Sequence, residues 1–81
     1  MEIAVATEAT EELASAFARL IPQLSATAVP PDREALAEII AAPCNTLLIA
    51  RHEGKIVGTL TLVVFRIPTA VRAWIEDVVV D

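Results

Sequence analysis

The sequence predicts an α+β domain in which two helices pack on a mostly antiparallel sheet of four strands, in the order β-α-α-β-β-β. Three observations support this prediction. The chain has 81 residues and is 56% hydrophobic, which suits one small domain and excludes intrinsic disorder. Apolar residues recur at helical spacing in the first half. From Thr46 this period gives way to β-branched residues and leucine, which is typical of strands that follow helices in an α+β domain.

The first elements are a short strand and a helix. Apolar residues alternate over residues 2–6, which predicts a strand. Either Thr7 or Thr10 can act as the N-cap of a helix over residues 8–21, and Pro22 is its predicted end. One face of this helix is apolar and carries Leu13, Phe17, Leu20, Ile21 and Leu24.

A second, shorter helix is predicted between two proline signals. Pro30-Pro31-Asp32 combines residues that favour a first turn and an N-cap, and Pro43 ends the helix. Its apolar side chains share one face, as expected for a helix lying on a sheet: Leu36, Ile39 and Ile40.

Three strands follow, over residues 46–52, 56–65 and 71–80. Glu53-Gly54-Lys55 is the turn between the first two. Regular alternation in the last strand places Trp74, Glu76, Val78 and Val80 on one face, and Ala73, Ile75, Asp77 and Val79 on the other. Because both faces are largely apolar, we expect this strand to be central and covered on both sides.

The charges exclude several classes of function. Six basic residues oppose eleven acidic ones, for a net charge of −5, and the basic residues are scattered. A nucleic-acid partner is therefore not expected, and no apolar run is long enough to span a membrane. We expect no metal site, because no Cys/His spacing supports one. With a single cysteine and no secretory signal visible, a cytoplasmic location is expected.

The last strand contains the best candidates for chemistry. Two adjacent carboxylates, Glu76 and Asp77, lie in a segment otherwise suited to burial, where an unpaired charge is costly. They can serve a reaction, or they can pair across strands with Arg72, Arg66 or Arg51. The sequence leaves both interpretations open.

Two segments resemble the N-terminal half of the GNAT superfamily of N-acetyltransferases: the hairpin over residues 48–60 and Trp74-Ile75-Glu76-Asp77-Val78-Val79-Val80-Asp81. The resemblance covers essentially all of residues 1–81. It implies an incomplete GNAT fold, whose last strand opens the wedge for acetyl-CoA, the co-substrate. It also implies transfer of an acetyl group to a primary amine on a small molecule or a peptide.

The resemblance also implies roles for individual residues. Glu76 is the general base or amine-orienting group, with Asp77 as a substitute in contact with the substrate. Trp74 would line the acceptor pocket, although a single tryptophan in a small apolar domain is more often a core filler. The backbone of Val78, Val79 and Val80 would bind the acetyl and pantetheine groups as a strand binds its neighbour, unless these are simply core valines.

The phosphate-binding loop of that family, Arg/Gln-x-x-Gly-x-Gly/Ala, does not occur in these residues. The glycines are Gly54 and Gly58, both in the hairpin. We therefore expect weak or no acetyl-CoA binding by the 81-residue chain alone. A reading frame that continued past Asp81 with that motif would favour an acetyltransferase, whereas a natural stop there would favour a function of another class. The acceptor amine is not identified, although the acidic balance favours a cation.

A different class of function is also open, that of a non-catalytic α+β interaction module. The predicted last strand, residues 71–80, would present an unpaired and apolar edge, and such edges are templates for pairing. We therefore expect a homodimer through this strand.

Overall fold

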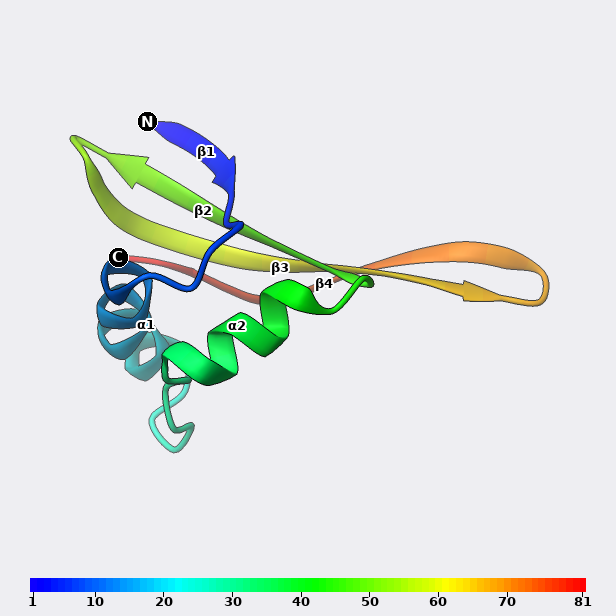
Figure 1. Ribbon diagram of the computed structural model, residues 1–81, viewed down its shortest axis with the longest axis horizontal. Helices are drawn as coiled ribbons and strands as arrows, with labels where there is room; N and C mark the ends of the chain where they lie inside the picture. The colour runs from blue at the N-terminus through cyan, green and yellow to red at the C-terminus, as the bar shows by residue number, and fades with distance from the viewer.

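The computed structural model covers residues 1–81 and confirms the predicted α+β class and order of elements. These are β1 (Glu2–Val5), α1 (Glu11–Leu24), α2 (Arg33–Ala41), β2 (Asn45–His52), β3 (Lys55–Ile67) and β4 (Ala70–Val80). The strands form one antiparallel sheet in the order β1-β2-β3-β4. Both helices lie on the same side of this sheet (Figure 1). Neither helix is long and apolar enough to cross a membrane.

Helix α1 begins three residues later than predicted and continues past its proline. Thr10 is the N-cap, and its hydroxyl accepts a hydrogen bond from the Leu13 amide at 3.1 Å. Pro22 lies inside the last turn, where the loss of one backbone donor affects a single hydrogen bond near the end of the helix. The helix therefore extends to Leu24, and the prediction that Pro22 ends it is wrong.

Helix α2 has the predicted cap and the predicted end. The Asp32 carboxylate accepts a hydrogen bond from the Ala35 amide at 2.8 Å. The last helical residue, Ala41, comes two positions before Pro43, as expected from the restriction that proline places on the residue before it.

The core lies between the helices and one face of the sheet. Leu20 of α1 and Leu36 of α2 are fully buried. The sheet contributes Leu47, Ile49, Ile56 and Val79 to the same cluster. Both helices therefore cover a single face, and each uses the apolar stripe predicted for it.

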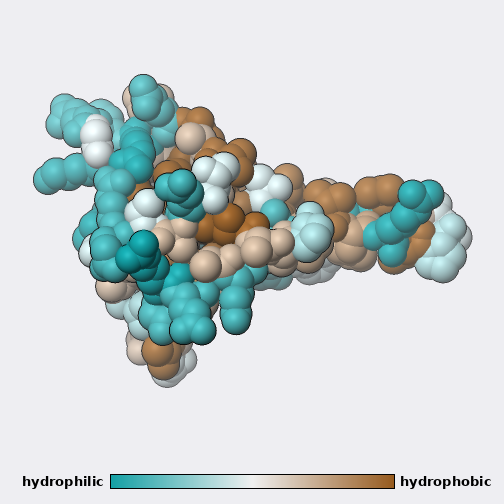
Figure 2. All heavy atoms as spheres, viewed as in Figure 1, coloured by the Kyte–Doolittle hydropathy of each residue, from teal (hydrophilic) through white to brown (hydrophobic).

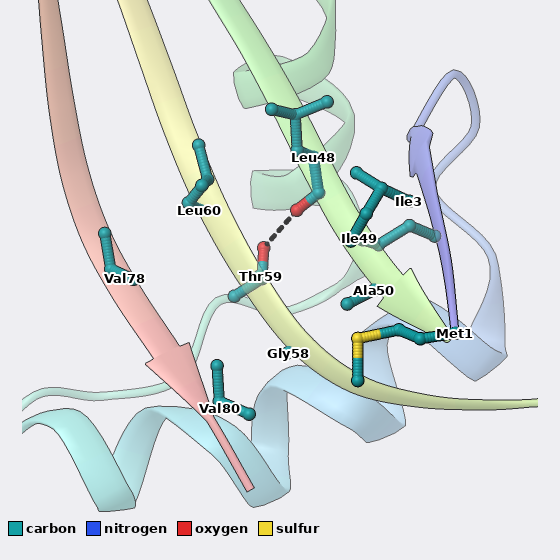
Figure 3. Close-up of a pocket in the computed structure, with 10 residues that line it drawn as sticks. All are labelled: Met1, Ile3, Leu48, Ile49, Ala50, Gly58, Thr59, Leu60, Val78 and Val80. Atoms are coloured by element: carbon teal, nitrogen blue, oxygen red, sulfur yellow. Dashed lines mark hydrogen bonds between the residues drawn. The ribbon is translucent and has the colours of Figure 1, made fainter. Parts of the chain in front are cut away.

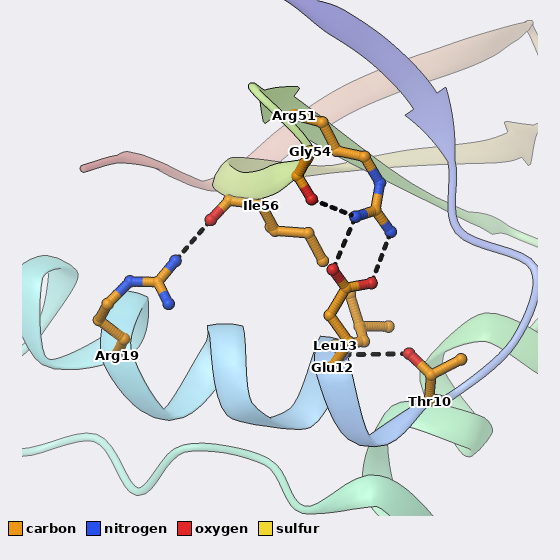
Figure 4. A network of polar contacts seen from close by, with 7 residues as sticks. All are labelled: Thr10, Glu12, Leu13, Arg19, Arg51, Gly54 and Ile56. Atoms are coloured by element: carbon orange, nitrogen blue, oxygen red, sulfur yellow. Dashed lines mark hydrogen bonds and ion pairs between the residues drawn. The ribbon is translucent and has the colours of Figure 1, made fainter.

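Polar contacts fix α1 against the sheet (Figure 4). Arg51 donates two parallel hydrogen bonds to the Glu12 carboxylate, both at 2.7 Å, and a longer one to the carbonyl of Gly54. Arg19 donates to the carbonyl of Ile56 at 2.5 Å. These contacts hold the first turn and the middle of α1 against the β2–β3 hairpin.

Strand β3 carries one extra residue relative to β2. Ala50 opposes Gly58, whereas the next residue, Arg51, opposes Ile56. Val57 is therefore the extra residue of a β-bulge, which rotates Ile56 onto the covered face, where it is buried. Regular alternation would have placed Ile56 on the opposite face.

The hairpin of β3 and β4 extends beyond the rest of the sheet. The last residue of β3 that pairs with β2 is Val63, and residues 64–73, here called the arm, form a two-stranded projection (Figure 1). The arm gives the molecule its longest dimension, 41 Å, against 29 and 20 Å along the other axes.

Strand β4 is an edge strand with most of its length exposed. It pairs with β3 alone, and Val79 is its single buried residue. The prediction of a central strand covered on both faces is therefore wrong. Its apolar side chains suit burial on either face, but both helices pack on the same side of the sheet.

Candidate functional site

A β-bulge interrupts β4 at the two carboxylates. Thr59 of β3 opposes Val79, and Thr61 opposes Glu76. Two residues of β4, Asp77 and Val78, therefore stand against one residue of β3. Asp77 adopts the left-handed backbone region, with φ of 49°, a conformation that aspartate tolerates better than most residues.

The bulge changes which side chains share a face. Trp74, Glu76 and Val79 all oppose residues on the helix-covered face of β3. Asp77 lines a cavity on that same side. The regular alternation predicted from the sequence, which separated Glu76 from Asp77 and grouped Glu76 with Val78 and Val80, is wrong, because the extra residue shifts the side-chain phase by one.

The cavity lies between the helices and the sheet and measures about 290 Å³. Its walls come from α1, the segment between the helices, α2 and the strands. Thr59, Thr61 and Asp77 line it from the sheet, and Ser25 lines it from the end of α1. The remaining lining residues are Phe17, Ile21, Leu24, Ala28, Val29, Pro31, Ile39 and Leu47. The site is thus largely apolar with a few convergent oxygen atoms, which is typical of small-molecule pockets.

Neither carboxylate of the site forms an ion pair. Arg51, proposed as one partner, binds Glu12 instead, and no salt bridge involves Arg66 or Arg72. Glu76 accepts a hydrogen bond from the Trp74 indole at 2.5 Å. Glu76 and Asp77 therefore form no cross-strand ion pair with an arginine.

The two carboxylates differ in position. Asp77 lines the cavity, whereas Glu76 does not and its side chain is held against Trp74 along the strand. Trp74 is itself 57% exposed. The interpretation of Trp74 as a core filler is therefore wrong, and its observed polar contact is with Glu76.

The outer edge of β4 has unpaired backbone groups next to the bulge. The Asp81 amide donates to the carbonyl of Val57 on β3 at 2.7 Å. Because neighbouring residues of an antiparallel strand point their backbone groups to opposite sides, those of Val80 face the open edge and those of Val79 face β3. Among the three valines predicted to bind through their backbone, Val80 has this orientation and Val79 does not.

The valine side chains also divide between the two faces. Val79 belongs to the core and is 7% exposed, whereas Val78 and Val80 are 53% and 62% exposed. The interpretation of all three as core valines is therefore correct for Val79 alone.

Sequence reasoning missed the hydroxyl groups of the cavity. Thr59 is buried and donates to the carbonyl of Leu48 at 2.9 Å, and Thr61 lies two residues further along β3. Two threonines at alternate positions of an aliphatic strand were a signal for one polar patch on one face. No comparable pattern in the sequence indicates that Ser25 would line the cavity.

The residues of this site contain no group of three or more metal-binding side chains, and neither does the rest of the chain. No family model matches the chain, and searches of curated proteins and of solved structures found no match either.

Proposed function

We propose that this chain provides the acceptor side of an N-acetyltransferase of the GNAT type, which transfers acetyl from acetyl-CoA to a primary amine. The observation that carries the proposal is the bulge in β4. It brings Asp77 to an apolar cavity on the face that also carries Glu76. The strand that contains it, β4, is the last of the sheet and has one edge without a partner. Carboxylates that can bind an amine therefore lie on the same strand as an open edge that can bind an extended co-substrate.

The cavity supports an amine as the acceptor. A cationic ammonium group entering it meets the Asp77 carboxylate, which has no arginine or lysine partner. The volume of about 290 Å³ suits a small acceptor or one side chain of a peptide. Asp77 is therefore the proposed amine-orienting group.

Glu76, which lies on the same face of β4 as Asp77 but outside the cavity, is the proposed proton acceptor and would take the proton through a water molecule. The Trp74 indole holds one of its carboxylate oxygen atoms, which leaves the other free to accept a proton. In the transfer, the amine nitrogen forms a bond to the acetyl carbon while the bond from that carbon to the CoA sulfur breaks. The ammonium group first loses one proton to Glu76, and the neutral amine then attacks. Once the bond to the acetyl carbon has formed, the nitrogen gives its second proton to the leaving thiolate, which departs as CoA thiol.

The open edge of β4 is the proposed binding position of the co-substrate. The outward N–H and C=O of Val80 can bind an extended acyl-pantetheine chain as a neighbouring strand would. Val78 and Val79 would contribute to the walls of this region, and Val79 does so from the core.

The test is an acetylation assay on the full translation product, with acetyl-CoA and a panel of primary amines, in which release of free CoA thiol is measured. We expect Glu76→Gln to lower kcat by about 10²–10⁴-fold, the usual loss with a general base. We expect Asp77→Asn to act mainly on KM for the amine, because the variant loses the negative charge that attracts the ammonium group. The backbone should be retained, since asparagine also tolerates the left-handed region. Glu38→Gln, an exposed carboxylate of α2 away from the cavity, is the matched control.

Two results would contradict this proposal. One is an absence of thiol release with every amine tested. The other is turnover that Glu76→Gln and Asp77→Asn leave at the level of the Glu38→Gln control. For the 81-residue chain alone we expect weak or no binding of acetyl-CoA, which calorimetry measures.

The second candidate function is a non-catalytic module that self-associates through its terminal strand. It is favoured by the position of β4 at the edge of the sheet, where one side of the strand has no partner. This module would show no thiol release and would form dimers that a change at the β4 edge disrupts.

A further inference from the structure

The sheet has one face without any covering element. Both helices pack on the other side (Figure 1), and the strand register assigns alternate side chains to the uncovered side, here called the open face. Its most exposed large side chains within the strands are Ile3, Val5, Val64, Val71, Ile75, Val78 and Val80. Each of these is 41% exposed or more.

The open face carries no charge over most of its length. Its charged or titratable side chains lie at the ends, with His52 and Lys55 at one end and Arg66 at the other. Between them the register places aliphatic residues, glycine, alanine and one threonine. Soluble monomers rarely expose continuous apolar patches of this extent.

The apolar surface of the open face is comparable to what a stable dimer buries. Its seven large aliphatic residues are 41–65% exposed, which corresponds to roughly 700 Å² against the about 800 Å² that each partner buries in an interface of standard size. A shallow hollow of about 180 Å³ lies on this face, at the end away from the arm (Figure 3). Leu48, Leu60, Val78 and Val80 are among its lining residues, and side chains of a facing sheet could fill it.

The charges of the chain are divided between the arm and the rest. Residues 64–73 contain two basic residues, Arg66 and Arg72, and no acid. Because the net charge is −5 in total, the remaining residues carry −7. Figure 2 shows hydrophobic atoms along the arm, whereas hydrophilic atoms gather over the helical part of the molecule. The strand register places no acid on the open face, so burial of apolar surface, and not charge pairing, would hold two copies together there.

We propose that two copies of this chain stack through their open faces, with the arm of each copy lying over the strands of the other. The contact is a twofold, face-to-face packing of two sheets. It is distinct from pairing along the β4 edge and does not depend on the proposed acetyl transfer. The acidic character of the chain outside the arm argues against an anionic membrane as the occupant.

The experiment is sedimentation velocity of the 81-residue chain from about 10 to about 300 µM, a range that covers affinities typical of modest interfaces. We expect a species of twice 8.6 kDa to increase with concentration. A monomer throughout this range would overturn the proposal. So would a monomer that binds neutral phosphatidylcholine vesicles, because the open face would then be a lipid surface.

A matched pair of variants tests the choice of face. Val64 and Phe65 are neighbours on β3, each 41% exposed, and alternate onto opposite faces. We expect Val64→Lys, on the open face, to weaken the dimer by about tenfold or more, and Phe65→Lys to change it by less than about twofold. Equal weakening by both would overturn the proposal.

A third variant separates the open face from the β4 edge. Val5 lies on β1, at the side of the sheet opposite to β4, and its side chain is 52% exposed on the open face. Val5→Lys should weaken the dimer as Val64→Lys does. A dimer unaffected by Val5→Lys would assign the contact to the β4 edge and overturn the proposal. Circular dichroism checks that each variant folds, which we expect because neither Val5 nor Val64 is buried.

Discussion

The two faces of the sheet come from the same strands and have similar apolar content, yet they have different structural roles. On β2, Leu47 and Ile49 are buried beneath the helices, whereas Leu48 and Ala50, at the alternate positions, are partly exposed. On β4, Val79 is 7% exposed and Val80 is 62% exposed. Apolar composition therefore does not decide which face stabilises the domain. The position of the two helices and the phase of the bulges decide it.

The largest expected difference between the faces concerns core leucines. Leu20 of α1 is fully buried against the covered face, so Leu20→Ala should lower the free energy of unfolding by about 2–5 kcal/mol. Ile75→Ala on the open face should change it by less than about 0.5 kcal/mol. Urea denaturation of dilute protein measures both, and equal losses would contradict the assignment of the core to one face.

A smaller difference is expected between two neighbouring valines of β4. Val79→Ala removes two buried methyl groups and should cost about 1–3 kcal/mol. Val80→Ala, at the next position on the open face, should stay within about 0.5 kcal/mol. If Val80→Ala proved the more damaging in dilute solution, the phase that we assign to the bulge would be wrong.

The smallest expected effect is a dependence of the free energy of unfolding on pH, which arises from the carboxylates that contact arginine and glutamine at α1. Hydrogen bonds from Arg51 lower the pKa of Glu12 below its ordinary value of 4.5. Hydrogen bonds from Gln23 and Arg19 lower the pKa of Asp81 below 3.8. Because a lowered folded-state pKa stabilises the fold above the unfolded value, this stabilisation is present at neutral pH. It is lost as the pH falls below 4.5 and then below 3.8.

Urea midpoints at neutral pH and near pH 3 measure this loss. Because both carboxylates are exposed, the change should be modest and should weaken with added salt. Glu12→Gln and Asp81→Asn should each flatten the acid side of the profile. If the double variant lost as much stability at acid pH as the unchanged protein, groups other than Glu12 and Asp81 would account for the loss.

The local signals in the sequence predicted the helices well. Thr10 and Asp32 act as the caps expected of them, and the apolar stripe with Leu13, Leu20 and Leu36 faces the sheet. These features depend on residues close in sequence, which is why the sequence sufficed to predict them.

The candidate site was predicted less completely. Residues around Asp77 have the pattern of an uninterrupted strand, so nothing local indicates the extra residue that reverses the phase after Glu76. The cavity joins α1, α2 and three strands, and its shape depends on packing between distant segments. Since both faces of the last two strands are apolar, the sequence also could not indicate which face remains open.

The bulge in β4 places Glu76 and Val79 on the helix-covered face and Val78 and Val80 on the open face. A nuclear Overhauser spectrum of the dilute, monomeric chain tests this placement of side chains. We expect contacts from the Val79 methyl groups to α1, from Glu76 to Thr61, and from Val78 and Val80 to Leu60. Contacts from Glu76 to Leu60 or Leu62, with Val79 still beneath α1, would show a regular strand and contradict the account.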